Sequence, residues 1–249
     1  MIRLGGLLAR IRSLRQPPLE AADVPRSVAI IMDGNSRWAA AEGLPVEAGH
    51  REGTRALRRT VEAALDLGIE TLTVYAFSTE NWLRPPAEVD ALMEIFGETI
   101  DRELPDLAKQ GVRTRFLGRR DRVSDDLQLR MEELERKTAH RERLSLWIAF
   151  DYGGRTELAD AARRAVEAGL GADEIDEDVL ATFLYAPELP DPDLLIRTSG
   201  ELRISNFLLW QLAYAELFFS DRLWPAFGEA DLRSAVREYA RRRRRFGAR

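Results

Sequence analysis

Four short segments of the chain combine arginines, small hydroxyl residues, glycines and a few acids, and each directly follows an apolar run. They read DGNSRW from Asp33, STENWLR from Ser78, DYGGR from Asp151 and RTSGELRISN from Arg197. Guanidinium groups match phosphate oxygens in a bidentate way, and glycines let the backbone approach a ligand closely. A lone acid such as Asp33 can hold a magnesium ion that bridges phosphate oxygens. The residue types therefore predict a site for a phosphorylated ligand.

Taken one at a time, these segments are also typical of ordinary turns and loops. Motifs that the chain lacks narrow the chemistry. It has no Gly-x-x-x-x-Gly-Lys-Ser/Thr loop, no Gly-x-Gly-x-x-Gly after a predicted strand and no Gly-x-Ser-x-Gly elbow. An aspartyl phosphatase would need a nucleophilic aspartate two residues before Asp33, where this chain has Ile31. The remaining chemistry is one in which a diphosphate group is held and then leaves.

Short apolar runs alternate along the chain with longer helical patterns. We predict strands over residues 28–32, 72–77, 112–117, 144–150 and 194–196, and helices over residues 53–67, 89–104, 125–138, 156–168 and 231–245. This alternation predicts an α/β fold with a mostly parallel central sheet flanked by helices. Ligands of such sheets bind beyond the carboxyl ends of the strands, so the four polar segments should converge on one edge.

The composition sets outer limits on the function. The chain has 249 residues, of which 45% are hydrophobic, enough for a sizeable core. It has no cysteine, and His50 and His140 are its only histidines, which excludes disulfides, thiolate sites and multi-histidine metal sites. The formal net charge of -5 argues against a nucleic-acid partner. Lys109 and Lys137 are the only lysines, so nearly all positive charge is arginine.

Residues 1–22 precede a single predicted domain over residues 23–249. Arginines alternate there with leucines and isoleucines, and the apolar run is too short and broken for a signal peptide or a membrane span. As a helix the segment is amphipathic and basic, so it could rest on a membrane surface. A lead-in or dimer-packing helix is the alternative. We expect a cytoplasmic protein. Any contact that it makes with the membrane would be peripheral, at the inner face.

Several motifs resemble those of the cis-prenyltransferases, whose bacterial members include undecaprenyl diphosphate synthase. They are VAIIMDGNSRWA, Gly49-His50, YAFSTENWLRP, YGGR, LWPAF and the highly specific RTSGELRISNFLLWQ. The resemblance runs in register from about Val28 to the C-terminal Arg-Phe-Gly. It implies a parallel α/β sheet, a homodimer and magnesium. It also implies condensation of isopentenyl diphosphate onto an allylic diphosphate such as farnesyl diphosphate, giving a long-chain polyprenyl diphosphate that serves as lipid carrier in bacterial cell-wall synthesis.

The resemblance also implies roles for individual residues at the first two segments. Asp33 matches the essential magnesium-linked acid, and Gly34, Asn35, Ser36 and Arg37 match the cradle of the allylic diphosphate at a helix N-terminus. Asn81 matches the position assigned to proton removal, although an amide is a poor base and is better suited to orienting or relaying a proton. Further family substrate-contact positions are Trp38, His50, Ser78, Thr79, Glu80, Trp82 and Arg84.

The C-terminal half matches the remaining family positions. Arg197, Arg203, Ile204 and Ser205 resemble the clamp for isopentenyl diphosphate. Glu216 falls on a second metal position that acts across the dimer interface. Arg245 belongs to an Arg-x-Gly tail that reaches the partner's site.

The chain departs from the family pattern at two places. Many bacterial members have an arginine that contacts diphosphate where this chain has Val46, so one cationic contact is absent. Ser36 stands where glycine is common. The growing chain needs a dry apolar tunnel, for which residues 72–77 and 89–104 are candidate walls, although core packing would explain those side chains equally well. Ala76 is small and leaves room beside the diphosphate motif, which favours a long product.

Two alternatives stay open. A catalytically silent binding subunit could support a separate active partner, but Asp33, Asn81 and Glu216 are all retained. A phosphate-ester hydrolase could use the same kind of sheet, but the chain lacks the usual nucleophile motifs. Incorporation of labelled isopentenyl diphosphate by the protein alone would distinguish these readings.

Overall fold

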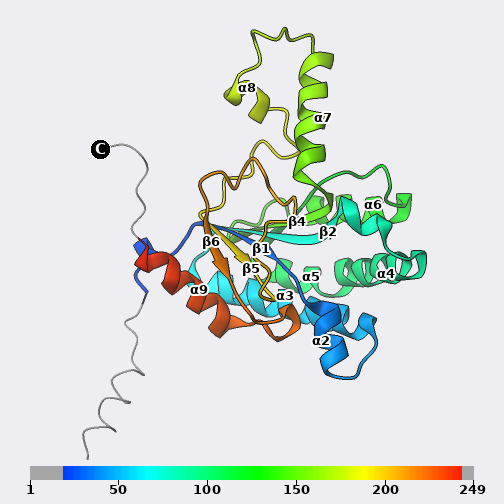
Figure 1. Ribbon diagram of the computed structural model, residues 1–249, viewed down its shortest axis with the longest axis vertical. Helices are drawn as coiled ribbons and strands as arrows, with labels where there is room; N and C mark the ends of the chain where they lie inside the picture. Colours follow the sequence, from blue (N-terminus) through cyan, green and yellow to red (C-terminus); the bar gives the residue numbers. More distant parts are fainter. Residues whose placement is uncertain (1–18, 243–249) are drawn as a thin grey trace, which may run out of the picture.

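A six-stranded parallel sheet forms the centre of the computed structural model, which describes residues 19–242. Its strand order is β3-β4-β2-β1-β5-β6, and every neighbouring pair is parallel. The strands are β1 Ser27–Ile31, β2 Thr71–Ser78, β3 Val112–Leu117, β4 Leu144–Tyr152, β5 Leu194–Arg197 and β6 Glu216–Phe219. The predicted fold class is confirmed, and all polar segments singled out in the sequence leave the same edge of this sheet (Figure 1).

Helices surround the sheet and make up most of the remaining regular structure. The α-helices are α2 Asn35–Ala41, α3 Val46–Leu67, α4 Pro86–Arg102, α5 Leu104–Lys109, α6 Asp125–Thr138, α7 Gly154–Glu167, α8 Glu177–Ala181 and α9 Glu229–Arg241. Short 3-10 helices are η1 Ala21–Asp23, η2 Thr79–Leu83 and η3 Trp224–Ala226.

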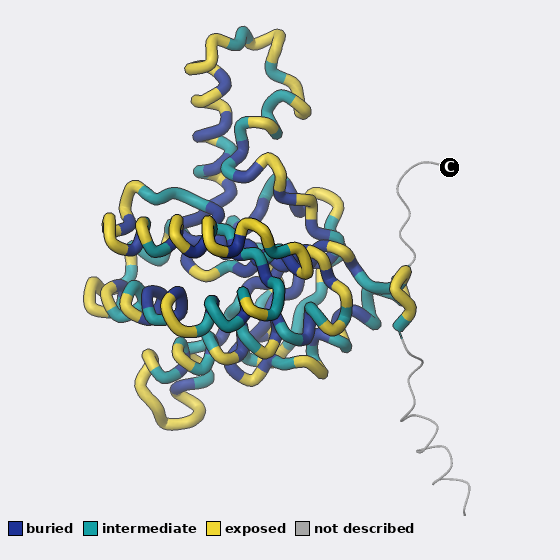
Figure 2. Tube along the Cα trace, turned by 180° about the vertical axis from the view of Figure 1, so that it is seen from behind, coloured by how far each residue is buried: buried dark blue, intermediate teal, exposed yellow. Residues whose placement is uncertain are grey.

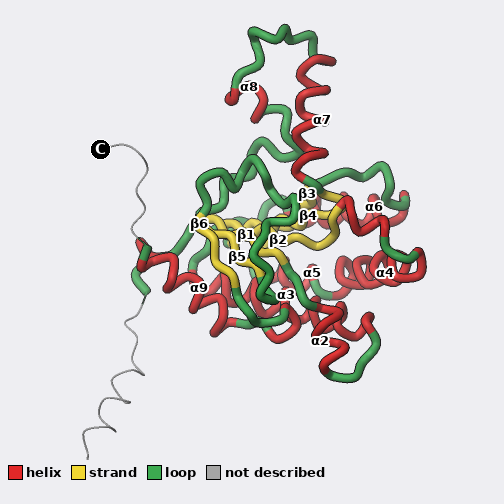
Figure 3. Tube along the Cα trace, viewed as in Figure 1, coloured by secondary structure: helices red, strands yellow, loops and turns green. Residues whose placement is uncertain are grey.

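The two faces of the sheet are covered differently. Side chains from α3, α4, α5, α6 and α9 pack on one face and form the larger apolar core. The other face is covered largely by chain without helices or strands, including Phe207, Leu208 and Leu212 (Figure 3). Buried residues are concentrated in the strands and on the inward sides of these layers (Figure 2). α7 projects from the body, and the loop that leaves its far end turns back to α8, which lies beside it (Figure 1).

α3 begins at Val46, seven residues before the predicted start at position 53, and two glycines explain how it does so. At Gly49, a Cβ atom would lie 2.2 Å from the Asn35 carbonyl oxygen, and at Gly53 it would lie 2.5 Å from Asn35 Oδ1. These glycines therefore let α3 pack directly against the N-terminus of α2. As predicted, the helix ends before Gly68, whose φ of 79° is the left-handed C-cap conformation.

Other elements differ from the sequence prediction at their ends. The predicted helix over residues 89–104 is two helices, α4 and α5, and Pro105 lies in the first turn of the second. The short elements β6 and α8 were not predicted, while α2 begins where the family resemblance implied a helix N-terminus. The predicted helix over residues 1–22 lies mostly outside the described residues, of which Ala21–Asp23 form η1.

Within residues 19–242, no helix is both long enough and apolar enough to cross a membrane.

Candidate active site

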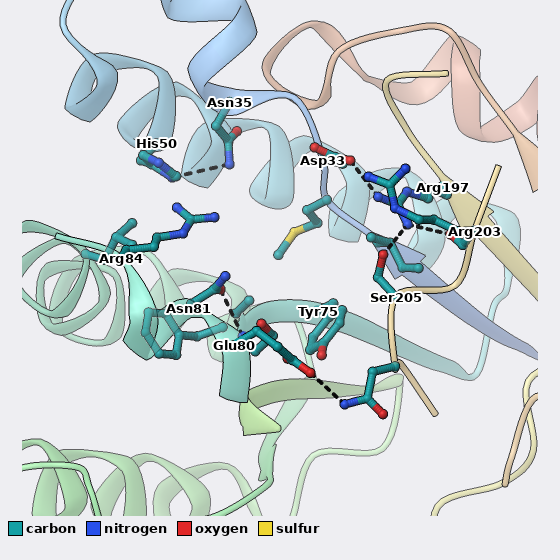
Figure 4. A pocket seen from close by; sticks show the side chains of 17 residues that line it. Asp33, Asn35, His50, Tyr75, Glu80, Asn81, Arg84, Arg197, Arg203 and Ser205 are labelled. Atoms are coloured by element: carbon teal, nitrogen blue, oxygen red, sulfur yellow. Dashed lines mark hydrogen bonds and ion pairs between the residues drawn. The ribbon is translucent and has the colours of Figure 1, made fainter. Parts of the chain in front are cut away.

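A cavity of about 560 Å³ opens at the carboxyl edge of the sheet, between β1, β2, η2, the start of α4 and the loop after β5 (Figure 4). Its lining mixes cationic, polar and apolar side chains. The lining residues are Ile31, Met32, Asp33, Asn35, His50, Tyr75, Ala76, Phe77, Ser78, Glu80, Asn81, Arg84, Leu92, Arg197, Arg203, Ser205 and Asn206. Three of the four polar segments, those from Asp33, Ser78 and Arg197, therefore meet at this cavity, whereas the segment from Asp151 does not line it.

Asp33 lies between two arginines just beyond the end of β1. Arg197 donates to Asp33 Oδ2 at 2.8 Å, and Arg37 donates to Oδ1 at 3.1 Å. Burial alone would raise the pKa of Asp33, but the hydrogen bonds from Arg197 and Ser199 and the charge of Arg37 outweigh it and hold the pKa below its usual value. The carboxylate is consequently ionised at neutral pH.

Arg197 is preorganised by its surroundings, because only 3% of its surface is exposed and its guanidinium contacts several acceptors. Besides Asp33, it donates to the hydroxyl of Ser205 at 2.6 Å and to the carbonyl of Arg203. Ser205 and Asn206 both have positive φ angles, 47° and 62°, so the loop turns sharply here around the guanidinium. Such a fixed cation suits recognition of a phosphate group.

Arg203 differs from Arg197 in being largely exposed. Its side chain is 62% exposed and pairs with Glu201. It lies beside Ser205 at the cavity wall (Figure 4). An exposed guanidinium on a loop can turn to meet a ligand without breaking the packed core.

Asn35 and His50 line the opposite wall, where α2 meets α3 (Figure 4). Asn35 Nδ2 lies 3.3 Å from His50 Nδ1. Asn35 Oδ1 and His50 Nε2 are buried and have no hydrogen-bond partner within the described chain, and Oδ1 faces Gly53 of α3. Burial, together with the nearby charge of Arg84, lowers the pKa of His50 and favours its neutral form.

Asn81 belongs to η2, whose N-terminus it caps. Its Oδ1 accepts a hydrogen bond from the Ser78 backbone N–H at 3.0 Å, within a reciprocal capping box. With the oxygen used in this way, the amide presents its N–H donors to the cavity. This geometry fits a residue that orients a ligand, and it disfavours proton removal by the amide itself.

A smaller apolar cavity of about 90 Å³ adjoins the first, and the two share Met32, Asn35, His50, Ala76, Phe77 and Leu92. It lies between the sheet and helices α3 and α4, and further apolar lining comes from Leu57, Ile95, Phe96, Ile148, Phe150 and Trp224. The predicted walls over residues 72–77 and 89–104 thus do border a hollow. A ligand with a charged head and an apolar tail would fit across the junction.

The donor set at Asp33 is compatible with a magnesium ion only if a ligand supplies oxygens as well. Among residues 19–242, no three His, Cys, Asp or Glu side chains gather closely enough to hold a metal ion by themselves. Mg²⁺ typically binds through one or two carboxylates together with waters and substrate phosphates. An ionised, partly exposed Asp33 beside two arginines fits that pattern.

Several predicted contact residues lie beside the cavity without lining it. Gly34, with φ of 108°, caps the N-terminus of α2, and Ser36 and Arg37 occupy its first turn. Thr79 donates to Glu80 at 3.1 Å. These positions lie directly behind or beside the lining residues.

Four other predicted residues face elsewhere. Trp38 lines a separate surface hollow. Ile204 packs against the smaller apolar core, on the face of the sheet covered by Phe207 and Leu208. Trp82 donates its indole N–H to the buried Asp151 at 2.8 Å, away from the cavity. Glu216 starts β6 in register with Leu194, at the opposite end of the sheet, where Arg242 pairs with it at 2.9 Å. Arg245 lies outside the described residues.

Some lining residues were not singled out individually, although Tyr75, Phe77 and Leu92 belong to the predicted walls over residues 72–77 and 89–104. Met32, Phe77 and Leu92 are apolar, and their types resemble those of any core residue. Tyr75 was placed in a strand, yet its ring stacks on Phe207 at 4.4 Å and borders the cavity. Asn206 ended a polar segment that was singled out, but residue type alone did not indicate its contacts.

Comparison with known proteins identifies the family of this chain. The family described as "Putative undecaprenyl diphosphate synthase" matches residues 31–247. A ditrans,polycis-undecaprenyl-diphosphate synthase ((2E,6E)-farnesyl-diphosphate specific) of Xanthomonas axonopodis pv. citri is 51% identical over 92% of this chain and 91% of its own. An isoprenyl transferase of Thermotoga maritima is 48% identical over 90% of this chain and 97% of its own.

Solved structures show the same similarity. Lavandulyl diphosphate synthase from Lavandula x intermedia, in complex with dimethylallyl diphosphate, is 36% identical with a TM-score of 0.87 and covers 91% of this chain and 100% of its own. A probable undecaprenyl diphosphate synthase from Campylobacter jejuni is 32% identical with a TM-score of 0.76 and covers 90% of this chain and 99% of its own. The predicted family is confirmed: this chain belongs to the undecaprenyl diphosphate synthase family of prenyltransferases.

Proposed function

We propose that this protein is a cis-prenyltransferase that condenses isopentenyl diphosphate onto an allylic diphosphate, farnesyl diphosphate, to make a long-chain polyprenyl diphosphate. The observation that supports it most is the junction between a polar, arginine-lined cavity and an apolar one. A relative at 51% identity is named for this activity and this primer, and one at 48% identity is named isoprenyl transferase. The product suits a lipid carrier of bacterial cell-wall synthesis.

In the proposed reaction, the C–O bond between the allylic carbon and its diphosphate breaks. The developing allylic cation joins the terminal double bond of isopentenyl diphosphate, and a proton leaves that unit to restore a double bond. Diphosphate leaves readily only when its charge is neutralised. Arg37 and the N-terminus of α2 flank one diphosphate position, while Arg197, Arg203 and Ser205 flank the other.

Magnesium is part of this proposal. Asp33 would hold it together with substrate oxygens, and the ion would supply additional neutralisation of the leaving diphosphate. The residues of the chain orient the substrates and exclude water. Asn81 orients the isopentenyl unit through its N–H donors, and the apolar cavity lined by Phe96 and Ile148 receives the lengthening chain away from water.

The active form in this proposal is a homodimer. Glu216 lies far from Asp33 within one chain, so a metal role for it requires the site of a partner subunit. Arg245 would reach the partner's site in the same way. We place the reaction in the cytoplasm, with peripheral contact at the membrane's inner face for release of the apolar product, through the basic segment over residues 1–22.

The test is incorporation of radiolabelled isopentenyl diphosphate into extractable lipid by the purified protein with farnesyl diphosphate and magnesium. We expect incorporation that stops when the metal is chelated and resumes when magnesium is restored. Asp33→Asn, which keeps an oxygen for Arg197 but loses the charge, should retain the fold and lose roughly 100-fold or more in rate, as expected when a charged group that acts on a leaving diphosphate is removed.

Each alternative predicts a different outcome. A phosphate-ester hydrolase would release inorganic phosphate without isopentenyl diphosphate. A silent binding subunit would incorporate nothing by itself. Near-normal turnover by Asp33→Asn would contradict the role given to Asp33.

A further inference from the structure

Asn206 joins three separate parts of the chain through one residue. Its backbone carbonyl accepts the N–H of Gly154 at 2.7 Å, and its side-chain Oδ1 accepts the N–H of Arg155 at 2.8 Å. These are the first two N–H groups of α7, whose N-cap residue Gly153 has no side chain to satisfy them. Asn206 therefore caps α7 from a distant position in the sequence.

These bonds fix which way the amide faces. Because Oδ1 accepts from α7, the Nδ2 group points to the other side, where it donates to Glu80 Oε1 of η2 at 2.8 Å. Figure 4 shows Glu80 turned toward the loop after β5. The packing at this junction is close: a Cβ atom at Gly153 would lie 2.5 Å from Thr79 Oγ1 and 2.8 Å from Asn206 Nδ2.

Glu80 is poorly suited to contact a diphosphate directly. Burial would raise the pKa of Glu80, but the hydrogen bond from Asn206 and further bonds within η2 lower it overall, so the group is anionic at neutral pH. Both oxygens already have protein partners, Asn206 on Oε1 and Thr79 on Oε2. A carboxylate beside phosphate oxygens is repelled by them, whereas one bound to an amide can hold two chain segments together.

The Glu80–Asn206 bond completes a connected path around one wall of the cavity. Asp33 binds Arg197, Arg197 binds Ser205, and the next residue, Asn206, binds Glu80, which directly precedes Asn81 (Figure 4). This path links the loop that bears Arg203 and Ser205 to the element that bears Asn81. Both must be held in a fixed relation if two diphosphate substrates are to react across the cavity.

We propose that Asn206 is a positioning residue for prenyl transfer: through Glu80 it fixes η2, and with it Asn81, against the loop that carries Arg203 and Ser205. The inference rests on the proposed function and changes the role of Glu80 from substrate contact to structural partner of Asn206.

The test exchanges the donor and acceptor of this bond. In Asn206→Asp, the aspartate still accepts from Arg155 but sets a second carboxylate against Glu80, so kcat should fall roughly tenfold or more, the effect expected of losing a charge-assisted hydrogen bond. In Glu80→Gln, the amide oxygen can still accept from Asn206, so the loss should be smaller. In the double variant, the amide of the introduced glutamine can donate to the introduced aspartate, and kcat should return to within roughly threefold of Glu80→Gln alone.

A matched control makes the same chemical change elsewhere. Gln110 Nε2 donates to Glu62 Oε1 at 3.4 Å, and neither residue lines the cavity. Gln110→Glu alters the net charge identically and opposes two carboxylates in the same way. It should leave kcat unchanged even where its thermal unfolding midpoint falls, because the altered bond lies away from the cavity.

The outcomes separate this inference from the proposed function. If the wild-type protein incorporates no isopentenyl diphosphate, the proposed function fails and the inference falls with it. If the wild type is active but the double variant is as slow as Asn206→Asp, the inference alone is wrong. A Glu80→Gln variant as slow as Asn206→Asp would also overturn it, because the carboxylate would then act on substrate.

Discussion

At the scale of single residues, neighbouring contacts give the same residue type different roles. Arg197 is buried and bound to Asp33 and Ser205, so it presents a fixed cation. Arg203 has the same side chain but is mostly exposed, and its charged partner among residues 19–242, Glu201, lies two residues away. We therefore expect Arg197 to shape the cavity itself and Arg203 to respond to the ligand that enters it.

Arg203→Ala should consequently separate the two substrates. We expect the KM for isopentenyl diphosphate to rise roughly tenfold or more, as for loss of one hydrogen bond to a charged group, with a much smaller change for farnesyl diphosphate. Steady-state kinetics with each substrate varied in turn measures this. Arg26→Ala is the control, since Arg26 is an exposed arginine paired with Glu70 at the far end of the sheet. Equal effects on both substrates would argue against separate diphosphate positions.

At the scale of elements, η2 is held from behind as well as from the cavity side. Asp151 is fully buried at the end of β4 and accepts from the indole of Trp82 at 2.8 Å and from Arg122 Nε at 3.1 Å. The Arg122 guanidinium also lies over the Trp82 ring, 5.2 Å from its centroid. Trp82 thus anchors the element whose other residues, Glu80 and Asn81, face the cavity.

Replacing Asp151 tests this anchor. Asp151→Leu leaves the Trp82 N–H without an acceptor, removes the partner of Arg122 and places leucine at a φ of 48°, which Asp and Asn tolerate better. We expect a stability loss of roughly 2–3 kcal/mol with a marked fall in kcat. Asp151→Asn keeps the oxygen that accepts from Trp82. It should therefore retain most of the stability and most of the kcat of the wild type. Chemical denaturation and steady-state rates provide the measurements, and equal damage from both variants would contradict the anchor.

A matched variant on β3 controls for general damage by such changes. Arg115 lies over the ring of Trp147, 4.8 Å from its centroid, and pairs with Glu188, and none of these residues lines the cavity. Arg115→Gln should lower stability modestly without changing kcat.

Elements with strong patterns could be predicted from the sequence, while those that depend on distant partners could not. The continuous apolar run of β1 is buried throughout, as such a run predicts for a parallel strand. β6 has only four residues, none of them in the buried class, so its sequence carries little strand signal and its pairing with β5 defines it. α3 begins early because Gly49 and Gly53 fit against Asn35, a contact that no local pattern reveals.

The same division applies to the candidate site. The polar segments could be found because each follows a predicted strand. The family resemblance supplied roles for Asp33 and Arg197, and the structure places these two residues in contact. Trp82 could not be placed correctly, because an indole beside a polar motif fits a ligand contact as well as a hydrogen bond to a buried acid. The contacts of Asn206 join residues 51 and 126 positions away, beyond any local pattern.

At the scale of the whole molecule, the sheet positions two cavities, one at its carboxyl edge and one on a single face. Its carboxyl edge holds the polar cavity, and the face covered by α3 and α4 holds the apolar one. Ala76 of β2 borders both cavities, at the point where a growing chain would pass from one to the other. The size of this side chain should therefore influence how far elongation proceeds.

The most direct test of this account is the product-length distribution, measured by mass spectrometry after incubation of farnesyl diphosphate with excess isopentenyl diphosphate. The wild-type protein should give long products that differ by whole isopentenyl units. Ala76→Leu should give clearly shorter ones at an initial rate within roughly threefold of the wild type, since the reacting groups are untouched while the passage is narrowed. Ala40→Leu, at an exposed position on α2, should leave the distribution unchanged. Products of unchanged length from Ala76→Leu, or no condensation product from the wild type, would contradict the account.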